Sequence, residues 1–214
     1  MASPMCPRPY RMGKRDVARA ETRQRILEAA RELLSSEAST DLSLETIARR
    51  ADVSRLTIYY HFRSRAGLLE ALYDHLASRG HMERMGDVFR APAQAQAFAS
   101  MIETFVRFWS TDTKAMRRLR AMGVLDAEIG EGIRARDARR PHIAREIFNR
   151  LGAKRGKSSN ADAEAVAAVL GMLTSFETYD ALATAGQSDR QIATILTRLA
   201  LCMVDSHVAR RHSR

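Results

Sequence analysis

Residues Ser43–Phe62, SLETIARRADVSRLTIYYHF, carry the strongest structural signal in this chain. Within this segment, apolar residues recur at the helical spacing on both sides of a break at residues 52–54. Ser43 and Ser54 stand where the two helices begin, and each hydroxyl can accept a hydrogen bond from an unpaired backbone N–H of the first turn. The stretch therefore predicts two short helices joined by a tight turn, the helix-turn-helix motif whose second helix lies in the major groove of DNA.

The rotation of about 100° per residue decides which side chains of the second helix face DNA. If Ile58 and Phe62 point into the core, Leu56 and Tyr60 point away from it. Arg55 has the reach and the planar fork to bond a guanine edge, and the hydroxyl and basic groups nearby suit phosphate contacts. We expect nine residues to contact DNA: Ser43, Ser54, Arg55, Leu56, Thr57, Tyr59, Tyr60, His61 and Arg65.

Flanking helices extend this motif into a small domain. Apolar positions at helical spacing predict one helix from Thr22 to Glu37 and another that begins at Ser64. Together with the motif at residues 43–62 they form an all-α, homeodomain-like unit of three to four helices. We place this DNA-binding domain at residues 21–80.

Residues 1–20 predict a basic, disordered arm. They hold three of the five prolines and show no apolar periodicity. Between Arg8 and Arg25 there are seven basic residues and two acidic ones. Such an arm can follow phosphates or enter a minor groove. It can equally be a solvated tail. The start of the protein can also have been assigned too early, because Met5 and Met12 are each possible first residues.

The rest of the chain, residues 88–210, also has a helical pattern, so the expected fold class is all-α. No strand pattern or internal repeat stands out. The expected helices are 93–110, 112–122, 126–151 (kinked or divided at Pro141), 161–185 (ended by Gly186) and a last one that begins with the capping box Ser188-x-x-Gln191, with a basic loop at 154–160.

The motif resembles the DNA-binding domain of the tetracycline-repressor (TetR) family of bacterial transcriptional regulators. The resemblance covers about 60 residues, and beyond them it rests on the number and order of the helices. It implies a C-terminal helical domain for effector binding and dimerisation, and a ligand-responsive repressor acting on a palindromic operator. The matching residues are Ile47-Ala48, Ala51, Val53-Ser54, Thr57-Ile58-Tyr59-Tyr60-His61-Phe62, Ser64 and Leu68.

Three positions depart from the family's pattern. Asp52 stands in place of the usual glycine, and aspartate tolerates the left-handed backbone that such a turn needs. Leu56 replaces a small residue or proline and can touch a thymine methyl. Arg65 replaces lysine and keeps the positive charge.

The last two expected helices carry apolar stripes that suit a homodimer. Two such hairpins related by a two-fold axis would form a four-helix bundle, which sets the spacing of the two recognition helices. The alternative is that both stripes face only their own subunit's core. The expected interface residues are Val169, Leu173, Phe176, Ile195, Leu199 and Cys202.

An effector pocket is the remaining expectation. The segment 93–110 is apolar over a wider surface than one packing stripe needs, although such a stripe is more often ordinary core. The resemblance implies a pocket between these helices for a small apolar or amphipathic effector. The candidates are Phe98, Met101, Ile102, Phe105, Trp109 and Met122, with Thr174, Glu177 and Tyr179 as polar groups.

Composition and motifs exclude other classes of protein. The net charge of +10 favours an anionic partner such as nucleic acid, and no apolar run is long enough to span a membrane. Neither a zinc-site spacing among the six histidines nor a nucleotide or nucleophile motif is present, so we expect no metal, no cofactor and no enzyme. The two cysteines and the lack of a secretory signal fit the cytoplasm.

One alternative stays open. A basic helical adaptor or membrane-surface protein would also explain the charge, because residues 134–157 carry nine basic and two acidic residues.

Overall fold

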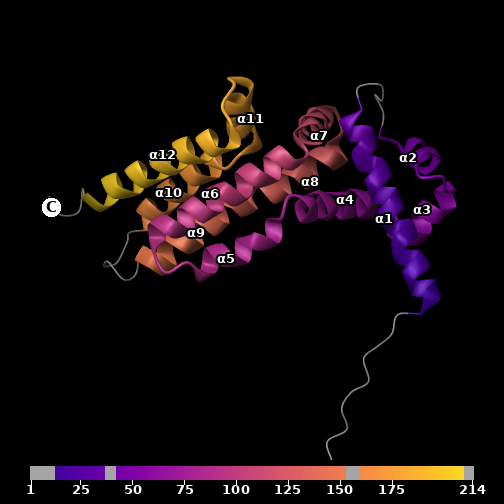
Figure 1. Ribbon diagram of the computed structural model, residues 1–214, viewed down its shortest axis with the longest axis horizontal. Helices are drawn as coiled ribbons and strands as arrows, with labels where there is room; N and C mark the ends of the chain where they lie inside the picture. Colours follow the sequence, from indigo (N-terminus) through magenta and orange to yellow (C-terminus); the bar gives the residue numbers. More distant parts are fainter. Residues whose placement is uncertain (1–12, 37–41, 153–159, 210–214) are drawn as a thin grey trace, which may run out of the picture.

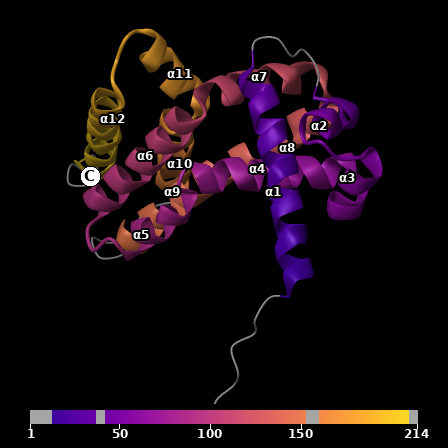
Figure 2. The ribbon, with the colours of Figure 1, turned by 45° about the vertical axis from the view of Figure 1, so that its right-hand side comes forward.

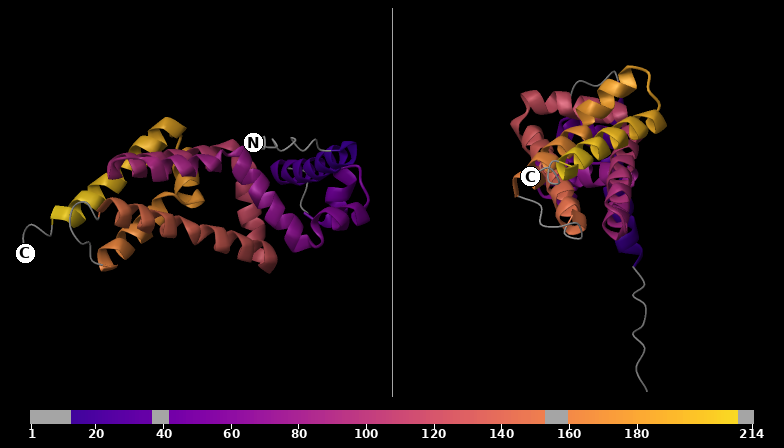
Figure 3. Two further views of the ribbon diagram at one scale, coloured as in Figure 1. Left: turned by 90° about the horizontal axis from the view of Figure 1, so that it is seen from below. Right: turned by 90° about the vertical axis from the view of Figure 1, so that its left-hand side faces the viewer.

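The computed structural model describes residues 13–36, 42–152 and 160–209, and every regular element in these ranges is a helix. Helices α1, α2 and α3 gather at one end of the molecule, and α5, α6, α9, α10 and α12 lie toward the other, with α4 running between them (Figure 1). The view from below shows the same elongated arrangement (Figure 3). The elements are α1 (Lys14–Ser35), α2 (Leu44–Arg50), α3 (Arg55–Phe62), α4 (Arg65–Arg79), the 3-10 turn η1 (Met82–Arg84), α5 (Met85–Arg90), α6 (Gln94–Thr111), α7 (Thr113–Leu125), α8 (Ala127–Asp137), α9 (Arg139–Gly152), α10 (Asn160–Leu173), α11 (Phe176–Thr184) and α12 (Asp189–Ala209).

Serine caps begin three successive helices, as the sequence predicts. Ser43, Ser54 and Ser64 each accept a hydrogen bond from the backbone N–H three residues later, at 3.2, 3.0 and 3.0 Å. Between α2 and α3, Asp52 has a φ of 51°, so this aspartate does adopt the left-handed conformation expected at the turn. The structure therefore contains the two short helices, the serine caps and the turn that the sequence predicts.

The core of the N-terminal domain takes one stripe from each of its four helices. Ile26 and Leu34 of α1, Ile47 of α2, Ile58 of α3 and Leu72 of α4 are each at most 2% exposed. Burying one such side chain contributes about 1.5–3 kcal/mol. This core fixes α3 against α1 and α4 and leaves the outer face of α3 in solvent.

The junction between α3 and α4 is very close. Arg63 ends α3 with a φ of 67°, and a Cβ built on Gly67 would lie 2.2 Å from the carbonyl oxygen of Phe62. Only glycine allows the first turn of α4 to approach the end of α3 in this way. The two helices are therefore held at a fixed angle.

A buried carboxylate joins the N-terminal domain to the rest. Asp112, between α6 and α7, accepts a hydrogen bond from Arg31 of α1 at 2.9 Å and from Arg79 of α4 at 2.9 Å. The Asp112 side chain is 6% exposed. Because a buried charge is costly unless it is paired, both arginines are held to this corner.

The expected arm is shorter than predicted. Helix α1 begins at Lys14, so the prediction of a disordered segment up to residue 20 is wrong for residues 14–20. The three prolines of residues 1–20 all precede Lys14, and the following residues are rich in Arg, Ala and Glu, which favour helix, with Asp16 in the first turn. The prediction for residues 1–12 lies outside the described residues.

Pro141 divides the expected helix 126–151, as predicted. Helix α8 ends at Asp137 and α9 begins at Arg139. Pro141 is the third residue of α9, where the backbone N–H has no partner within the helix, so the missing donor costs nothing there.

The expected single helix over 161–185 is wrong, because it is broken at residues 174–175. Ser175 caps α11 by accepting from the backbone N–H of Thr178 at 3.2 Å, while the carbonyl of Thr174 accepts from the indole Nε1 of Trp109 at 3.0 Å. A serine cap and a distant tryptophan together outweigh the helical periodicity. Gly186, with a φ of 83°, ends the segment as predicted, and the basic loop at 154–160 lies outside the described residues except for Asn160.

The last helix begins as expected. The backbone N–H of Ser188 donates to the Gln191 side chain at 2.9 Å, and the Gln191 N–H donates back to the serine hydroxyl at 3.4 Å. Across the described ranges, no helix is long and apolar enough to cross a membrane.

We predict that Gly67→Ala destabilises the N-terminal domain by about 1–3 kcal/mol, because the new methyl group would collide with the Phe62 carbonyl. Urea unfolding measures this change. Gly86→Ala is the control: its nearest neighbour would be the Arg90 side chain at 3.4 Å, so stability should stay unchanged or rise. Equal stability of both variants would contradict the close α3–α4 contact.

Candidate functional site

The outer face of α3 is exposed, and it is rich in aromatic and apolar groups. Leu56 is 77% exposed, Tyr60 65% and Tyr59 42%, whereas Ile58 and Phe62 are buried. This confirms the predicted division of α3 into an inner and an outer face. Large apolar side chains that share one exposed face indicate a binding surface.

Two arginines of α1 lie beside the end of α3. The Arg19 guanidinium is 5.2 Å from the centre of the Tyr60 ring, and that of Arg23 is 4.4 Å from the Phe62 ring. Arg23 also donates to the carbonyl oxygen of His61 at 3.4 Å. The expected DNA-contact residues did not include this pair, although its four-residue spacing on α1 is a sequence signal.

The surroundings of His61 disfavour its charged form in the free protein. Burial, followed by repulsion from Arg19 and Arg23, lowers the pKa of His61 from its ordinary value of 6.5. In the free protein the uncharged ring is therefore favoured at neutral pH.

The hydroxyl groups expected to contact phosphate have a local role first. The Ser43 and Ser54 oxygens cap α2 and α3, and each also lies 2.9 Å from the hydroxyl of the threonine three residues later, which is Thr57 in the second case. Both Ser54 and Arg55 lie exposed at the start of α3. The structure thus brings the α3 residues together on one surface, and their contact with DNA stays a prediction.

Arg65 faces α8, contrary to its expected place among the phosphate contacts. It forms an ion pair with Asp126 at 2.6 Å and another with Glu128. Asp126 also caps α8 by accepting from the N–H groups of Glu128 and Ile129 at 3.1 and 3.2 Å. One carboxylate therefore holds the start of α4 and the start of α8 together.

Further contacts join α4 to α8 along their length. Arg136 forms an ion pair with Glu70 at 2.8 Å and lies 4.2 Å from the centre of the Tyr73 ring. The Tyr73 hydroxyl donates to the carbonyl oxygen of Ile129 at 2.9 Å, and burial raises the pKa of Tyr73 to about 12. We call the contacts made by Arg65, Glu70, Tyr73, Asp126 and Arg136 the α4–α8 clasp.

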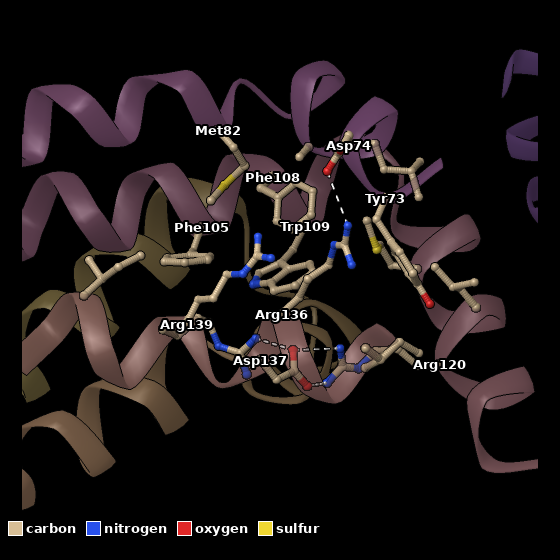
Figure 4. Close-up of a pocket in the computed structure, with 17 residues that line it drawn as sticks. Tyr73, Asp74, Met82, Phe105, Phe108, Trp109, Arg120, Arg136, Asp137 and Arg139 are labelled. Atoms are coloured by element: carbon tan, nitrogen blue, oxygen red, sulfur yellow. Dashed lines mark hydrogen bonds and ion pairs between the residues drawn. The ribbon is translucent and has the colours of Figure 1, made fainter. Parts of the chain in front are cut away.

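A cavity of about 300 Å³ lies between α4, α6, α7, α8 and α9. Figure 4 shows aromatic side chains of α6 on one side and arginines of α8 and α9 on the other. The lining residues are Tyr73, Asp74, Leu76, Ala77, Met82, Phe105, Phe108, Trp109, Met116, Leu119, Arg120, Ile133, Arg136, Asp137, Arg139, Arg140 and Ile143.

Only two of the nine expected effector residues, Phe105 and Trp109, line this cavity. Phe98, Met101 and Ile102 are at most 1% exposed and belong to the core. Helix α6 turns these three side chains away from the cavity, which takes its opposite wall from α8 and α9 instead.

The four other expected residues also lie outside the cavity. Met122 packs against the core. The break before α11 carries the remaining three away: Thr174 is buried, Tyr179 bonds Asp189 at 3.2 Å, and Glu177 forms an ion pair with Arg120 at 2.6 Å.

The cavity wall that the sequence analysis missed is basic. Asp137 accepts hydrogen bonds from Arg120, at 2.7 Å, and from Arg140. Burial opposes ionisation of Asp137, but these two hydrogen bonds outweigh it and lower the pKa of Asp137 below its ordinary range. The sequence signal for this wall is a mixture of arginines and isoleucines: Ile133, Arg136, Arg139, Arg140 and Ile143. It was missed because a solvated helix face has the same mixed pattern.

The expected dimer interface needs two corrections. Leu173 and Phe176 are each 4% exposed and are buried in their own chain, because the break at residues 174–175 turns Phe176 inward against Trp109. The others remain accessible: Leu199 is 51% exposed, Cys202 is exposed, and Val169 and Ile195 are half-buried. Met172, at 58% exposed, was missed. We call these five the α10–α12 face: Val169, Met172, Ile195, Leu199 and Cys202.

No cluster of histidine, cysteine and acidic residues in the described part of the chain is arranged to hold a metal ion.

These features define a helix-turn-helix protein, with an exposed recognition helix on a small capped domain and a larger helical domain that contains a cavity. Residues 26–72 match the family model of the bacterial regulatory proteins of the tetR family. The helix-turn-helix part of the chain therefore matches the DNA-binding domain of the tetR family.

Relatives of known sequence match the DNA-binding part. The HTH-type transcriptional regulator SrpR of Pseudomonas putida is 45% identical over 71 residues, which are 33% of this chain and 32% of that protein. TtgW, also of Pseudomonas putida and named an uncharacterized HTH-type transcriptional regulator, is 45% identical over 71 residues, 33% of this chain and 51% of that protein. The chain thus matches a third to a half of the length of these relatives.

Solved structures match nearly the whole chain in fold. NalD of Pseudomonas aeruginosa, described as the secondary repressor of the MexAB-OprM multidrug efflux pump, has a TM-score of 0.65 at 22% identity, over 87% of this chain and 96% of that chain. A TetR-like transcriptional regulator from Rhodococcus sp. RHA1 has a TM-score of 0.62 at 21% identity, over 89% of this chain and 97% of that chain.

We predict that Asp126→Asn weakens the α4–α8 clasp without removing the cap of α8, because asparagine caps as well as aspartate but carries no charge. The free energy of unfolding at pH 7 should fall by about 0.5–1 kcal/mol in urea titrations. Asp126→Ala, which also loses the cap, should cost about 1 kcal/mol more.

The effect should depend on pH in a definite direction. The hydrogen bond from Arg65, opposed by burial, lowers the pKa of Asp126 from its ordinary 3.8. The stabilisation is therefore present above pH 3.8 and is lost as the pH falls below it. A difference between wild type and Asp126→Asn that persists in acid would contradict the ion pair.

Proposed function

We propose that this protein is a DNA-binding transcriptional repressor that acts in the cytoplasm as a homodimer on a palindromic operator and releases it when a small molecule fills the cavity. The observation that carries the proposal is the outer face of α3. It holds Leu56, Tyr59 and Tyr60 in solvent beside Arg55, on a motif that matches the TetR family. Exposing these large apolar groups to water costs free energy. Contact with the base edges and phosphates of DNA would cover them.

In this proposal α3 lies in the major groove. Arg55 at its start reaches a guanine edge, and Leu56 touches a thymine methyl. Tyr59, Tyr60 and Thr57 contact phosphates and set the register. Ser43, Ser54 and His61 add phosphate contacts at the ends of the motif.

Helix α1 supports the same surface. Figures 1 and 2 show its N-terminal end extending past α3, and Arg19 and Arg23 sit beside α3 through their contacts with Tyr60 and Phe62. Two positive charges here would attract the phosphate backbone next to the groove that α3 enters.

A homodimer gives the recognition helices a fixed spacing. Two copies of α10 and α12 packed through the α10–α12 face would form a four-helix bundle and cover Met172 and Leu199, which are half exposed in the single chain. The two α3 helices would then meet successive turns of a palindromic site.

Ligand binding in the cavity can change the position of α3 through α4. Tyr73, Asp74 and Leu76 of this helix line the cavity, and the first turn of the same helix packs tightly on the end of α3 through Gly67. A ligand that fits the cavity in only one position of α4 would favour that position and change the spacing of the α3 helices. NalD is described as a repressor, and the same sign of regulation is proposed for this chain.

We predict that Arg55→Ala weakens operator binding about tenfold or more, because a bidentate contact to a base is worth about 1–3 kcal/mol. Tyr60→Ala should also weaken binding, because it removes a phosphate contact, but to a similar extent for every DNA sequence. The operator is first selected from a random-sequence duplex library by the wild-type protein, and affinities are then measured by anisotropy at several salt concentrations. Arg190→Ala is the matched control, since Arg190 is exposed on α12 and its loss changes the charge equally.

The contrary result would be an affinity for anionic lipid vesicles with no preference among DNA sequences. That outcome would support a basic adaptor or membrane-surface protein in place of a regulator.

We predict that Leu199→Glu converts the protein to a monomer at micromolar concentration and lowers operator affinity, because a carboxylate would be buried in the α10–α12 face. Sedimentation velocity measures the mass. Val124→Glu is the control, since Val124 is 83% exposed at the end of α7 and lies outside that face. A dimer that tolerates Leu199→Glu would place the interface elsewhere.

A further inference from the structure

We infer that the cavity takes a small anionic amphiphile, such as an aryl-alkyl carboxylate, with its acid group on Arg139 and its apolar part against Phe105 and Trp109. This inference rests on the proposed ligand response, because it names the chemical class of the ligand for the same cavity. It is argued from the two unlike walls of the cavity.

The wall formed by α6 is apolar and rigid. Phe105 and Trp109 are each 4% exposed, and the Trp109 ring lies 4.4 Å from that of Phe108. The hydrogen bond from the Trp109 indole to the carbonyl of Thr174 fixes the orientation of the ring. Aromatic walls of this kind bind flat or flexible apolar groups.

The size of the cavity limits the ligand. Its volume of about 300 Å³ lies at the lower end of the range of about 300–1,000 Å³ found for ligand pockets. The ligand is therefore small, of the order of one ring with a short chain.

The opposite wall brings four arginines to the cavity, and three of them are already paired. Arg120 and Arg140 share Asp137, and Arg136 pairs with Glu70 and Asp74. These contacts satisfy the inner carboxylate, Asp137, while Asp74, whose side chain is 78% exposed, lies 3.3 Å from Arg136.

Arg139 is different. Among the residues that the structure describes it makes no ion pair within 4 Å and no hydrogen bond through its side chain, and its charge acts on Glu70 only at longer range. Figure 4 shows its side chain reaching from α9 toward the cavity, near Phe105 and Trp109. A guanidinium offers five N–H donors in a planar fork that matches a carboxylate.

The balance of charge favours an anion over other ligands. The cavity is lined by four arginines and two aspartates. The outer partners Glu70 and Glu177 have side chains 58% and 64% exposed, so water screens their charge more than that of the inner arginines. A cation would be repelled from this wall, and a neutral amphiphile would leave the Arg139 donors to water.

The test uses the full-length protein and three matched probes: 4-phenylbutanoate, 4-phenylbutanol and 4-phenylbutylammonium. Trp109 is the only tryptophan of the chain, so its fluorescence, excited selectively, reports binding at the cavity wall without any DNA. We expect the anion to bind about tenfold tighter than the alcohol, as a charge-assisted hydrogen bond provides, and the ammonium compound to bind weakest.

Substitutions locate the acid group. Arg139→Gln should remove the advantage of the anion while leaving the affinity for the alcohol unchanged, and Arg139→Lys should keep part of the advantage. Arg107→Gln is the matched control, because Arg107 is exposed on α6 and does not line the cavity. An equal or tighter affinity for the alcohol, an advantage of the anion that survives Arg139→Gln, or no binding of any probe would overturn the inference.

Operator binding is measured separately with each probe. If 4-phenylbutanoate binds through Arg139 and leaves operator affinity unchanged, the ligand class is upheld and the proposed ligand response fails. If only the alcohol releases the operator, the ligand response is upheld and the ligand class is wrong.

Discussion

Helix α4 belongs to two hydrophobic cores at once, and this constraint governs the rest of the structure. Leu68 and Leu72 of α4 lie in the core of the DNA-binding domain, while Tyr73 and Leu76 of the same helix line the cavity of the larger domain. Protein interiors are close-packed, so one helix cannot shift in one core without repacking the other. The position of the recognition helix is thereby tied to the packing around the cavity.

Charged groups fix α4 at both of its ends. Arg65 at the first turn pairs with Asp126 on α8, and Arg79 at the last turn pairs with the buried Asp112 at the α6–α7 corner. Ion pairs between partly exposed groups contribute little to stability, but they select one angle between helices from several that apolar packing alone would allow. The α4–α8 clasp therefore specifies geometry more than it adds free energy.

The sequence predicts well those features that depend on neighbours in the chain. The caps at Ser43, Ser54 and Ser64, the turn at Asp52 and the outer face of α3 all follow from residues within a few positions of each other. The break before α11 could not be predicted in this way, because the carbonyl of Thr174 is held by Trp109, 65 residues away. The cavity wall could not be predicted for the same reason. Arg136 and Arg139 line the cavity because α8 packs on α4 and α9 packs on α6, and the sequence pattern of an arginine-rich helix is the same when that helix faces solvent.

The division of the cavity walls between helices has a consequence for how such a protein diverges. Residues of α9 such as Arg139 and Ile143 contact the cavity and take no part in the DNA-binding domain, whereas Tyr73 and Asp74 of α4 lie on a helix that must also carry α3. If the cavity binds the proposed ligand, substitutions in α9 change the preferred ligand and leave the proposed DNA contacts of α3 intact. Gene duplication could thus yield regulators that share an operator and answer to different chemicals, with the changes confined to one wall of the cavity.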